Sequence, residues 1–290
     1  MSLVGHTEDL TSHDEYDRVR VEPMTDVFFD RTTTLPNRLN VSTHCGPELT
    51  MRLHPVPQTC RLGSLRTSVA SFIIDALAGI AVDGDQDTWT FTSQMSVRMV
   101  NTPAPAYVEG RAMVLRQGAR SATCEVTLVD EAGRSHGYGV LSFVRVARRD
   151  GDPVKHVFNS SAESQRGFMG PVIEGTLPDE MGINIIDGPA GTVEVVVEDK
   201  LRNPSGAMQG AMVACVAEVA AEEMISVRLG LPAFVSDLDI RYLSQVRVGP
   251  VRTTSTWLGD DPWSWVRVEL HDVTSGVLLT HALARAAVGE

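Results

Sequence analysis

The hydrophobic pattern of the chain contains two long apolar stretches, each interrupted by one acidic residue. The stretch from Val69 to Val82 carries Asp75, and the stretch from Ala211 to Ala221 is small and apolar except at Glu218. Apolar runs of this length favour buried helices. Because a carboxylate is rarely buried in an apolar helix unless it is paired or used, both acidic residues are candidates for a functional role.

The two stretches belong to an internal repeat. Asp75 aligns with Glu218, which sets an offset of 143, and at this offset Gly63 aligns with Gly206 and Arg98 with Arg241. Apolar positions fall on apolar positions throughout the two predicted helices. A strand-like segment precedes each helix, at LTMRLHP in the first half and TVEVVVE in the second. The chain therefore contains the same unit twice.

Further strands follow each helix. They are rich in β-branched and aromatic residues and are bounded by Gly, Asp and Pro, as strands of an antiparallel sheet are. The predicted strands span 107–116, 121–130 and 138–146 in the first half and 248–257, 264–271 and 277–288 in the second. A strand, a long helix and then a run of strands is an α+β pattern, and two copies in one chain predict a fused pseudo-dimer.

These patterns divide the chain into four parts. We predict a tail at 1–33, with a turn of helix near 22–31, a first unit at 34–147, a linker at 148–170 and a second unit at 171–290. The linker segment RRDGDPVKHVFNSSAESQ is polar and contains Gly and Ser, which is typical of a connection between domains.

Composition and charge narrow the classes of function. The net charge of −12 disfavours binding to nucleic acid or to an anionic membrane, and no apolar run is long enough to span a bilayer. The four cysteines form no C-x-x-C pair, the eight histidines show no metal-ligand spacing, and the polar N-terminus has no signal-peptide core. We therefore expect a cytoplasmic protein with reduced thiols and without a metal or cofactor.

The segment LPDEMGINIIDGPAGTVEVVVEDKLRNPSGAMQG resembles the opening of PaaI-like acyl-CoA thioesterases. A helix wrapped by an antiparallel sheet is also similar to the hotdog fold, so the resemblance implies an α+β double hotdog. Asn203, Gly206, Gly210 and Glu218 match the spacing of the family motif. Gln209 stands where the family usually has His, and the resemblance implies an acyl- or aryl-CoA thioester as substrate.

The first half departs from the motif at the start of its helix, where Cys60, Arg66 and Thr67 replace the Asn, His and Gly of the family. The resemblance implies that sites lie between two hotdog units. One helix cannot supply a complete site, because Glu218 lies eight residues beyond Gly210, roughly 12 Å along the axis. If the two helices pack antiparallel, Gly210 faces Asp75 and Thr67 faces Glu218.

Thioester hydrolysis needs donors aimed at an oxyanion and a carboxylate that attacks or activates water. The N–H of Gly210 at a helix start is such a donor, and the amide of Asn203 can supply another. We therefore expect Asn203, Gln209 and Gly210 to act with Asp75. The other possible site combines Cys60, Arg66 and Thr67 with Glu218. There Arg66 is expected to pair with Glu218, which makes that site a structural relic.

Several residues are candidates for binding the substrate. The stretch at Gly118 to Arg120 is similar to the CoA-side loop of the family, and the basic cluster of Arg145, Arg148 and Arg149 could meet CoA phosphates. The apolar wall of the site is expected from Phe72, Trp89, Met208 and Met212. The resemblance also implies a homodimer of double-hotdog chains.

Two other functions are open. The change from His to Gln at position 209 and the degenerate second site favour a non-catalytic acyl-CoA-binding protein. A hotdog enoyl-CoA hydratase would need a His shortly after Asn203-Pro204, and no His follows until His271. Thioester hydrolysis is therefore the first prediction, ligand binding alone the second and hydration the third.

Overall fold

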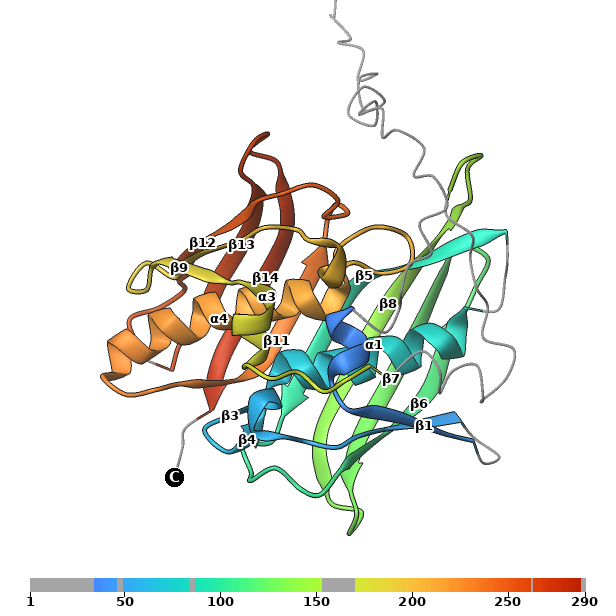
Figure 1. Cartoon of the computed structure of the whole chain (residues 1–290), viewed down its shortest axis with the longest axis horizontal. Helices are drawn as coiled ribbons and strands as arrows, with labels where there is room; N and C mark the ends of the chain where they lie inside the picture. The colour runs from blue at the N-terminus through green and yellow to red at the C-terminus, as the bar shows by residue number, and fades with distance from the viewer. Residues whose placement is uncertain (1–33, 46–48, 84–86, 153–169, 262, 288–290) are drawn as a thin grey trace, which may run out of the picture.

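The computed structural model describes residues 34–45, 49–83, 87–152, 170–261 and 263–287 (Figure 1). The predicted tail at 1–33, with its turn of helix, lies outside these residues, and so does most of the predicted linker. Among the described residues, no helix is long and apolar enough to cross a membrane.

The main element is one twelve-stranded antiparallel sheet. The strands of the first half are β1 (Val41–Cys45), β2 (Leu49–Leu53), β5 (Thr88–Met99), β6 (Val108–Gln117), β7 (Ser121–Asp130) and β8 (Ser135–Ala147). Those of the second half are β9 (Asn184–Asp187), β10 (Thr192–Val195), β11 (Phe234–Tyr242), β12 (Val251–Trp257), β13 (Val266–Asp272) and β14 (Leu278–Ala287). Their order in the sheet is β1-β2-β6-β7-β8-β5-β11-β14-β13-β12-β10-β9.

The second half of this order repeats the first half in reverse, as two copies related by a two-fold axis would. The copies meet where β5 pairs with β11, and Ser96 there lies opposite Asp239. These two positions differ by 143, so each is the repeat equivalent of the other. The pseudo-two-fold axis therefore passes through this pair, and it places the start of one helix near the middle of the other.

The two long helices are α1 (Thr67–Val82) and α4 (Gly210–Leu229). They contact each other and lie on the same face of the sheet, with α1 over the first half and α4 over the second (Figure 1). Buried apolar side chains cover most of both helices, as the sequence pattern predicts. Helix α4 is followed by Gly230, which has the left-handed conformation that favours glycine after a helix.

Short elements complete each half. They are η1 (Leu35–Arg38), η2 (Pro57–Thr59), β3 (Cys60–Arg61), β4 (Ser64–Leu65), α3 (Leu177–Met181) and η3 (Asp199–Leu201). Helices η1 and α3 both begin with Leu-Pro, where proline favours the first helical turn. Arg38 of η1 forms an ion pair of 3.3 Å with Glu180 of α3, so the two halves also meet here.

The predicted strands agree with the structure to within a few residues. Strand β7 has the predicted bounds, whereas β12 begins at Val251 rather than at Val248. Pro250 has no N–H to donate to a neighbouring strand, which accounts for the later start.

Candidate active site

The structure brings Asp75 of α1 to the start of α4. The Nε2 atom of Gln209 donates a hydrogen bond of 3.0 Å to Oδ2 of Asp75. The predicted contact between the middle of the first helix and the beginning of the second is thereby confirmed. It depends on the pseudo-two-fold packing, because the two residues are far apart in the chain.

Gln209 has a second role as the N-cap of α4. Its Oε1 atom accepts hydrogen bonds from the N–H groups of Ala211, at 2.6 Å, and Met212, at 3.3 Å. Because these donors require an oxygen, the cap fixes which end of the amide faces Asp75. The Nε2 group uses one hydrogen for Asp75 and keeps a second one that can bind a ligand.

Gly210 is the first residue of α4, and its N–H has no acceptor within the helix. A Cβ atom at this position would lie 3.2 Å from Oδ2 of Asp75 and 3.3 Å from the hydroxyl of Tyr242. The hydroxyl of Tyr242 donates a hydrogen bond of 3.0 Å to the carbonyl of Gly210. A methyl group here would make tight contacts with both side chains, so the carboxylate or the phenol would have to shift by a few tenths of an ångström.

Asp75 has one further partner on the sheet. The hydroxyl of Thr92 in β5 donates a hydrogen bond of 2.6 Å to Oδ1 of Asp75. Burial raises the pKa of Asp75 to about 6, although the hydrogen bond from Thr92 acts to lower it. A carboxylate with a pKa near neutrality can take up and release a proton at physiological pH.

Asp75, Gln209 and Gly210 line a cavity of about 480 Å³. This volume lies within the usual range of small-molecule sites. The wall formed by α1, β5 and β8 is mostly apolar, and the wall formed by the segments before α4 and after β11 is more polar. The lining residues from these parts are Phe72, Asp75, Ala76, Gly79, Ile80, Thr90, Phe91, Thr92, Ser93, Phe143, Val144, Val146, Arg202, Asn203, Pro204, Ala207, Met208, Gln209, Gly210, Val213, Tyr242, Leu243, Ser244, Gln245 and Val246, and Thr34, Pro36 and Asn37 add to them from the start of the first half.

Asn203 lines the cavity, and the oxygen of its side-chain amide accepts hydrogen bonds from its own loop. Oδ1 accepts hydrogen bonds from the N–H and hydroxyl groups of Ser205 and from the N–H of Ala207. This arrangement is an Asx-type turn, and it leaves the amide NH₂ as the end of Asn203 that can donate to a ligand.

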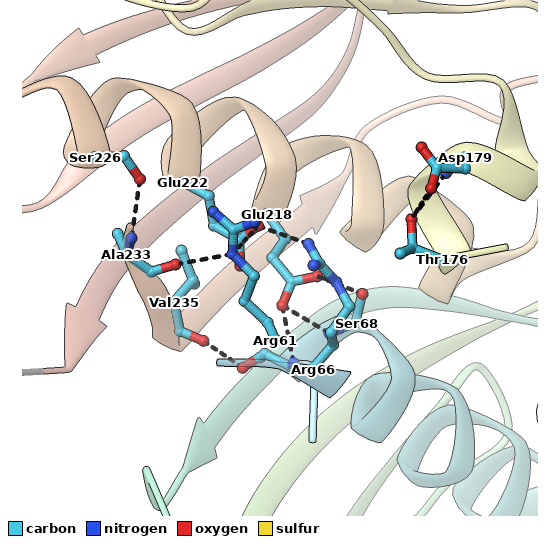
Figure 2. Close-up of polar contacts among 11 residues, drawn as sticks. Arg61, Arg66, Ser68, Thr176, Asp179, Glu218, Glu222, Ser226, Ala233 and Val235 are labelled. Atoms are coloured by element: carbon cyan, nitrogen blue, oxygen red, sulfur yellow. Dashed lines mark hydrogen bonds and ion pairs between the residues drawn. The ribbon is translucent and has the colours of Figure 1, made fainter. Parts of the chain in front are cut away.

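The second combination predicted from the repeat forms a closed ion-pair cluster (Figure 2). Glu218 is completely buried and accepts hydrogen bonds from Arg66, at 3.2 Å, and from the N–H of Thr67, at 2.9 Å. Ser68 also donates its hydroxyl to Glu218. The predicted pairing of Arg66 with Glu218 is therefore confirmed, and Glu218 does not line the cavity that contains Asp75.

Glu222 explains why the two combinations differ. It is the repeat equivalent of Gly79, and it accepts a hydrogen bond of 2.6 Å from Arg66. Arg61 approaches the same carboxylate at 3.7 Å (Figure 2). In the first half, the space beside Gly79 is open. In the second half, the charged side chains of this cluster fill the equivalent space.

The predicted CoA-binding residues lie elsewhere. Arg145 donates hydrogen bonds to the carbonyls of Gly118, at 2.7 Å, and Val82, at 3.0 Å, so its guanidinium joins a turn to the end of α1. The carbonyl of Arg120 accepts from the N–H of Arg145, and the side chain of Arg120 is exposed. None of the three residues lines the cavity, and their contact with a CoA phosphate stays a prediction.

The predicted apolar wall is partly wrong. Phe72 and Met208 line the cavity, but Met212 and Trp89 do not. Met212 is fully buried because it lies on a face of α4 that packs into the core. Within the described residues, no group of His, Cys, Asp and Glu side chains is placed to hold a metal ion.

Thr92 and Tyr242 were missed by the sequence reasoning. At the repeat offset they correspond to Val235 and Met99, so both are polar residues where the other half has an apolar one. A residue-by-residue comparison of the two halves for such differences would have found them.

No family model matches the chain, and no curated protein matches it. Several solved structures are similar in fold. An acyl-ACP thioesterase from Bacteroides thetaiotaomicron is 11% identical, with a TM-score of 0.52 over 87% of this chain and 99% of that one. A 12:0-ACP thioesterase from Umbellularia californica is 13% identical, with a TM-score of 0.56 over 84% and 98%. A tesB protein from Mycobacterium avium subs paratuberculosis is 11% identical, with a TM-score of 0.55 over 87% and 97%.

These structures match nearly their whole length, so the likeness extends across both halves of the chain. At such identities the likeness shows the fold and not the chemistry. The chain has a hotdog-type α+β fold, which it shares with thioesterase structures.

Proposed function

We propose that this chain is a PaaI-like double-hotdog thioesterase that hydrolyses an acyl- or aryl-CoA thioester to the free acid and CoA. The observation that carries the proposal is the hydrogen bond between Gln209 and Asp75 at the wall of the cavity. It places a carboxylate of raised pKa beside the start of a twenty-residue helix. The fold shared with thioesterases supports the same reaction.

Asp75 acts as the general base in this proposal. It takes a proton from a water molecule as the water oxygen attacks the thioester carbon. The N–H of Gly210 and the second Nε2 hydrogen of Gln209 stabilise the negative charge that develops on the carbonyl oxygen. The C–S bond then breaks, CoA leaves as the thiolate and takes the proton back from Asp75, and the acid is released.

The amide NH₂ of Asn203 is a further donor for the substrate, because its Oδ1 atom is held by the loop. Glu218 has no catalytic role in this proposal, since its carboxylate is buried in the ion-pair cluster. The polar wall of the cavity, which includes Ser244 and Gln245, faces the pantetheine side of the substrate. The exposed Arg120 remains a candidate for the CoA phosphates.

We also propose that 34–147 and 171–290 are the two hotdog units and that the protein is a cytoplasmic homodimer. Cys60, Cys124 and Cys215 are free thiols, which supports a reducing compartment. Light scattering after size exclusion should give twice the chain mass of 31.4 kDa. A mass equal to one chain would contradict the dimer and leave the catalytic proposal intact.

The substitution Asp75→Asn tests the reaction. Release of CoA should fall by at least about a hundredfold across a panel from acetyl- to palmitoyl-CoA that includes phenylacetyl- and benzoyl-CoA. Asn keeps an acceptor for Gln209, so binding of the substrate should persist. Glu218→Gln serves as the matched control, and it should retain hydrolysis.

The same variant has a stability readout. Because burial raises the pKa of Asp75 above its unfolded value, ionisation of Asp75 opposes folding, and this cost appears as the pH rises through about 6. Asp75→Asn should therefore raise Tm relative to the wild type at pH 8 and not at pH 4. Loss of activity together with a raised Tm excludes misfolding as the cause.

One outcome favours the alternative of a non-catalytic acyl-CoA-binding protein. If the wild type binds acyl-CoA saturably but hydrolyses no member of the panel, the catalytic proposal is wrong. If Glu218→Gln abolishes turnover and Asp75→Asn does not, the site has been assigned to the wrong carboxylate.

A further inference from the structure

We propose that the acyl group of the substrate is an elongated apolar chain that lies along α1 over Gly79, and that Gly79 determines how bulky and how long this group can be. The inference rests on the proposed thioester hydrolysis and names the substrate class and a residue that selects it. It is carried by the lining of the cavity, the space beside Gly79 and the contrast with the other half.

The first observation is the face that α1 presents to the cavity. The lining residues Phe72, Asp75, Ala76, Gly79 and Ile80 recur at the spacing of one helical face. Apart from Asp75, all of them are apolar. An acyl group that leaves the thioester carbon at Asp75 and follows this face reaches Gly79 after one turn, roughly 6 Å along the axis.

The second observation is the open space at Gly79. A Cβ atom built there would meet no atom of the described residues within 4 Å. Gly79 lies inside α1, where glycine costs about 0.5–1 kcal/mol relative to alanine, and its helical backbone does not require glycine. Neither packing nor backbone conformation accounts for the residue, whereas room for a ligand does.

The third observation is the internal comparison. The equivalent of Gly79 in the second half is Glu222, which is buried and binds Arg66. The equivalent of Ile80 is Glu223, so two consecutive positions of this face are acidic in the second half. The same helical face is therefore apolar and open in one half but charged and filled in the other. The difference separates a half that can accept an apolar chain from a half that cannot.

Within the described part of the chain, the far end of the apolar wall is partly exposed. Val144 and Val146 of β8 line the cavity and are 40% and 41% exposed. A chain longer than the distance from Asp75 to Gly79 can therefore continue along β8. This geometry favours medium-to-long straight acyl groups over acetyl groups.

The substitution Gly79→Leu tests the inference through chain length. It should reduce kcat/KM for decanoyl- and dodecanoyl-CoA by at least about tenfold and leave acetyl- and butyryl-CoA within about threefold of the wild type. Gly79→Ala is the graded control and should give a smaller effect in the same direction. An equal loss for all chain lengths, or no change for any, would overturn the inference.

Binding separates this inference from the proposed reaction. Titration calorimetry with S-alkyl-CoA thioethers, from ethyl to dodecyl, measures chain-length selection without hydrolysis. The wild type should bind the long thioethers more tightly, and Gly79→Leu should remove that preference. If the preference is present and responds to Gly79 while no thioester is hydrolysed, the reaction is wrong and the acyl site stands. If thioesters are hydrolysed without any preference that responds to Gly79, the acyl site is wrong and the reaction stands.

Discussion

At the residue scale, Gly210 shows how the absence of a methyl group makes a site possible. The carboxylate of Asp75 and the hydroxyl of Tyr242 both approach to the distance of a tight contact with the missing Cβ. Gln209 holds the carboxylate from the other side while it caps the helix. Small displacements at such a site are costly, because catalysis depends on the relative position of donor, carboxylate and substrate.

We expect Gly210→Ala to lower kcat/KM by at least about tenfold, because the new methyl group displaces Asp75 or Tyr242. Gly175→Ala is the matched control, since the same methyl group there meets Asp179 and Glu180 only at ordinary contact distances and Gly175 does not line the cavity. It should keep wild-type activity. Similar losses in both variants would contradict the role of Gly210.

The pH dependence is a second prediction at this scale. Because Asp75 must be ionised to act as a base, kcat/KM should rise with pH through about 6 and then level off. The hydrogen bond from Thr92 lowers the pKa of Asp75, so Thr92→Val should move this rise to higher pH. Activity should then fall more at pH 6 than at pH 8.5. Thr90→Val, which removes a hydroxyl that binds Asp83 instead, should not move the profile.

At the element scale, α4 serves the two halves differently. Its first turn completes the cavity through Gln209 and Gly210, and its middle carries Glu218 and Glu222 into the cluster with Arg66. This cluster lies where α1 begins, so it fixes the crossing of the two helices. Removing one partner of a buried ion pair leaves an uncompensated charge, which is more costly than the loss of a surface pair.

We therefore expect Arg66→Met to lower the free energy of unfolding by about 3–5 kcal/mol. The matching surface variant Arg252→Met, which loses an ion pair of 2.6 Å with Glu194, should cost less than about 1 kcal/mol. Thermal and denaturant unfolding measure both. Hydrolysis per folded molecule should be retained in both variants, because neither arginine lines the cavity. Loss of turnover in folded Arg66→Met would show that the cluster belongs to the active site.

At the scale of the whole molecule, the site depends on the way the two halves meet. Strands β5 and β11 pair across the pseudo-two-fold axis, and Arg98 bridges this junction through ion pairs with Asp237, at 3.1 Å, and Asp239, at 2.8 Å. Helices α1 and α4 also contact each other. We therefore expect the two halves to stay together after the covalent connection between them is cut in the folded protein.

A specific protease site inserted between 153 and 169 tests this interpretation and the predicted linker. After cleavage of the folded protein, the two fragments should elute together on size exclusion, and thioester hydrolysis should continue. Fragments that separate without denaturant, or that lose activity on cleavage, would contradict the proposed domain boundaries. The uncleaved insertion variant is the control for the effect of the insertion itself.

Much of this arrangement follows from the order of residues alone. The repeat at an offset of 143 and the apolar helices around Asp75 and Glu218 indicate two equal units. Antiparallel pairing of such units puts Gly210 against Asp75 and Arg66 against Glu218, as the structure confirms. These predictions succeed because helix periodicity, strand patterns and pseudo-symmetry are all properties of residue spacing.

Other features required the folded chain. Thr92 and Tyr242 come to Asp75 and Gly210 from strand β5 and its neighbour β11, and the difference between the two halves marks these positions without showing that they meet the site. Arg145 donates hydrogen bonds to two backbone carbonyls, which the sequence does not indicate, and its contact with CoA stays a prediction. The meaning of the open space at Gly79 is clear only when the folded chain shows that its equivalent in the other half, Glu222, fills that space with an ion pair. Such features depend on which side chains meet across packed elements, and residue spacing along one element does not specify those contacts.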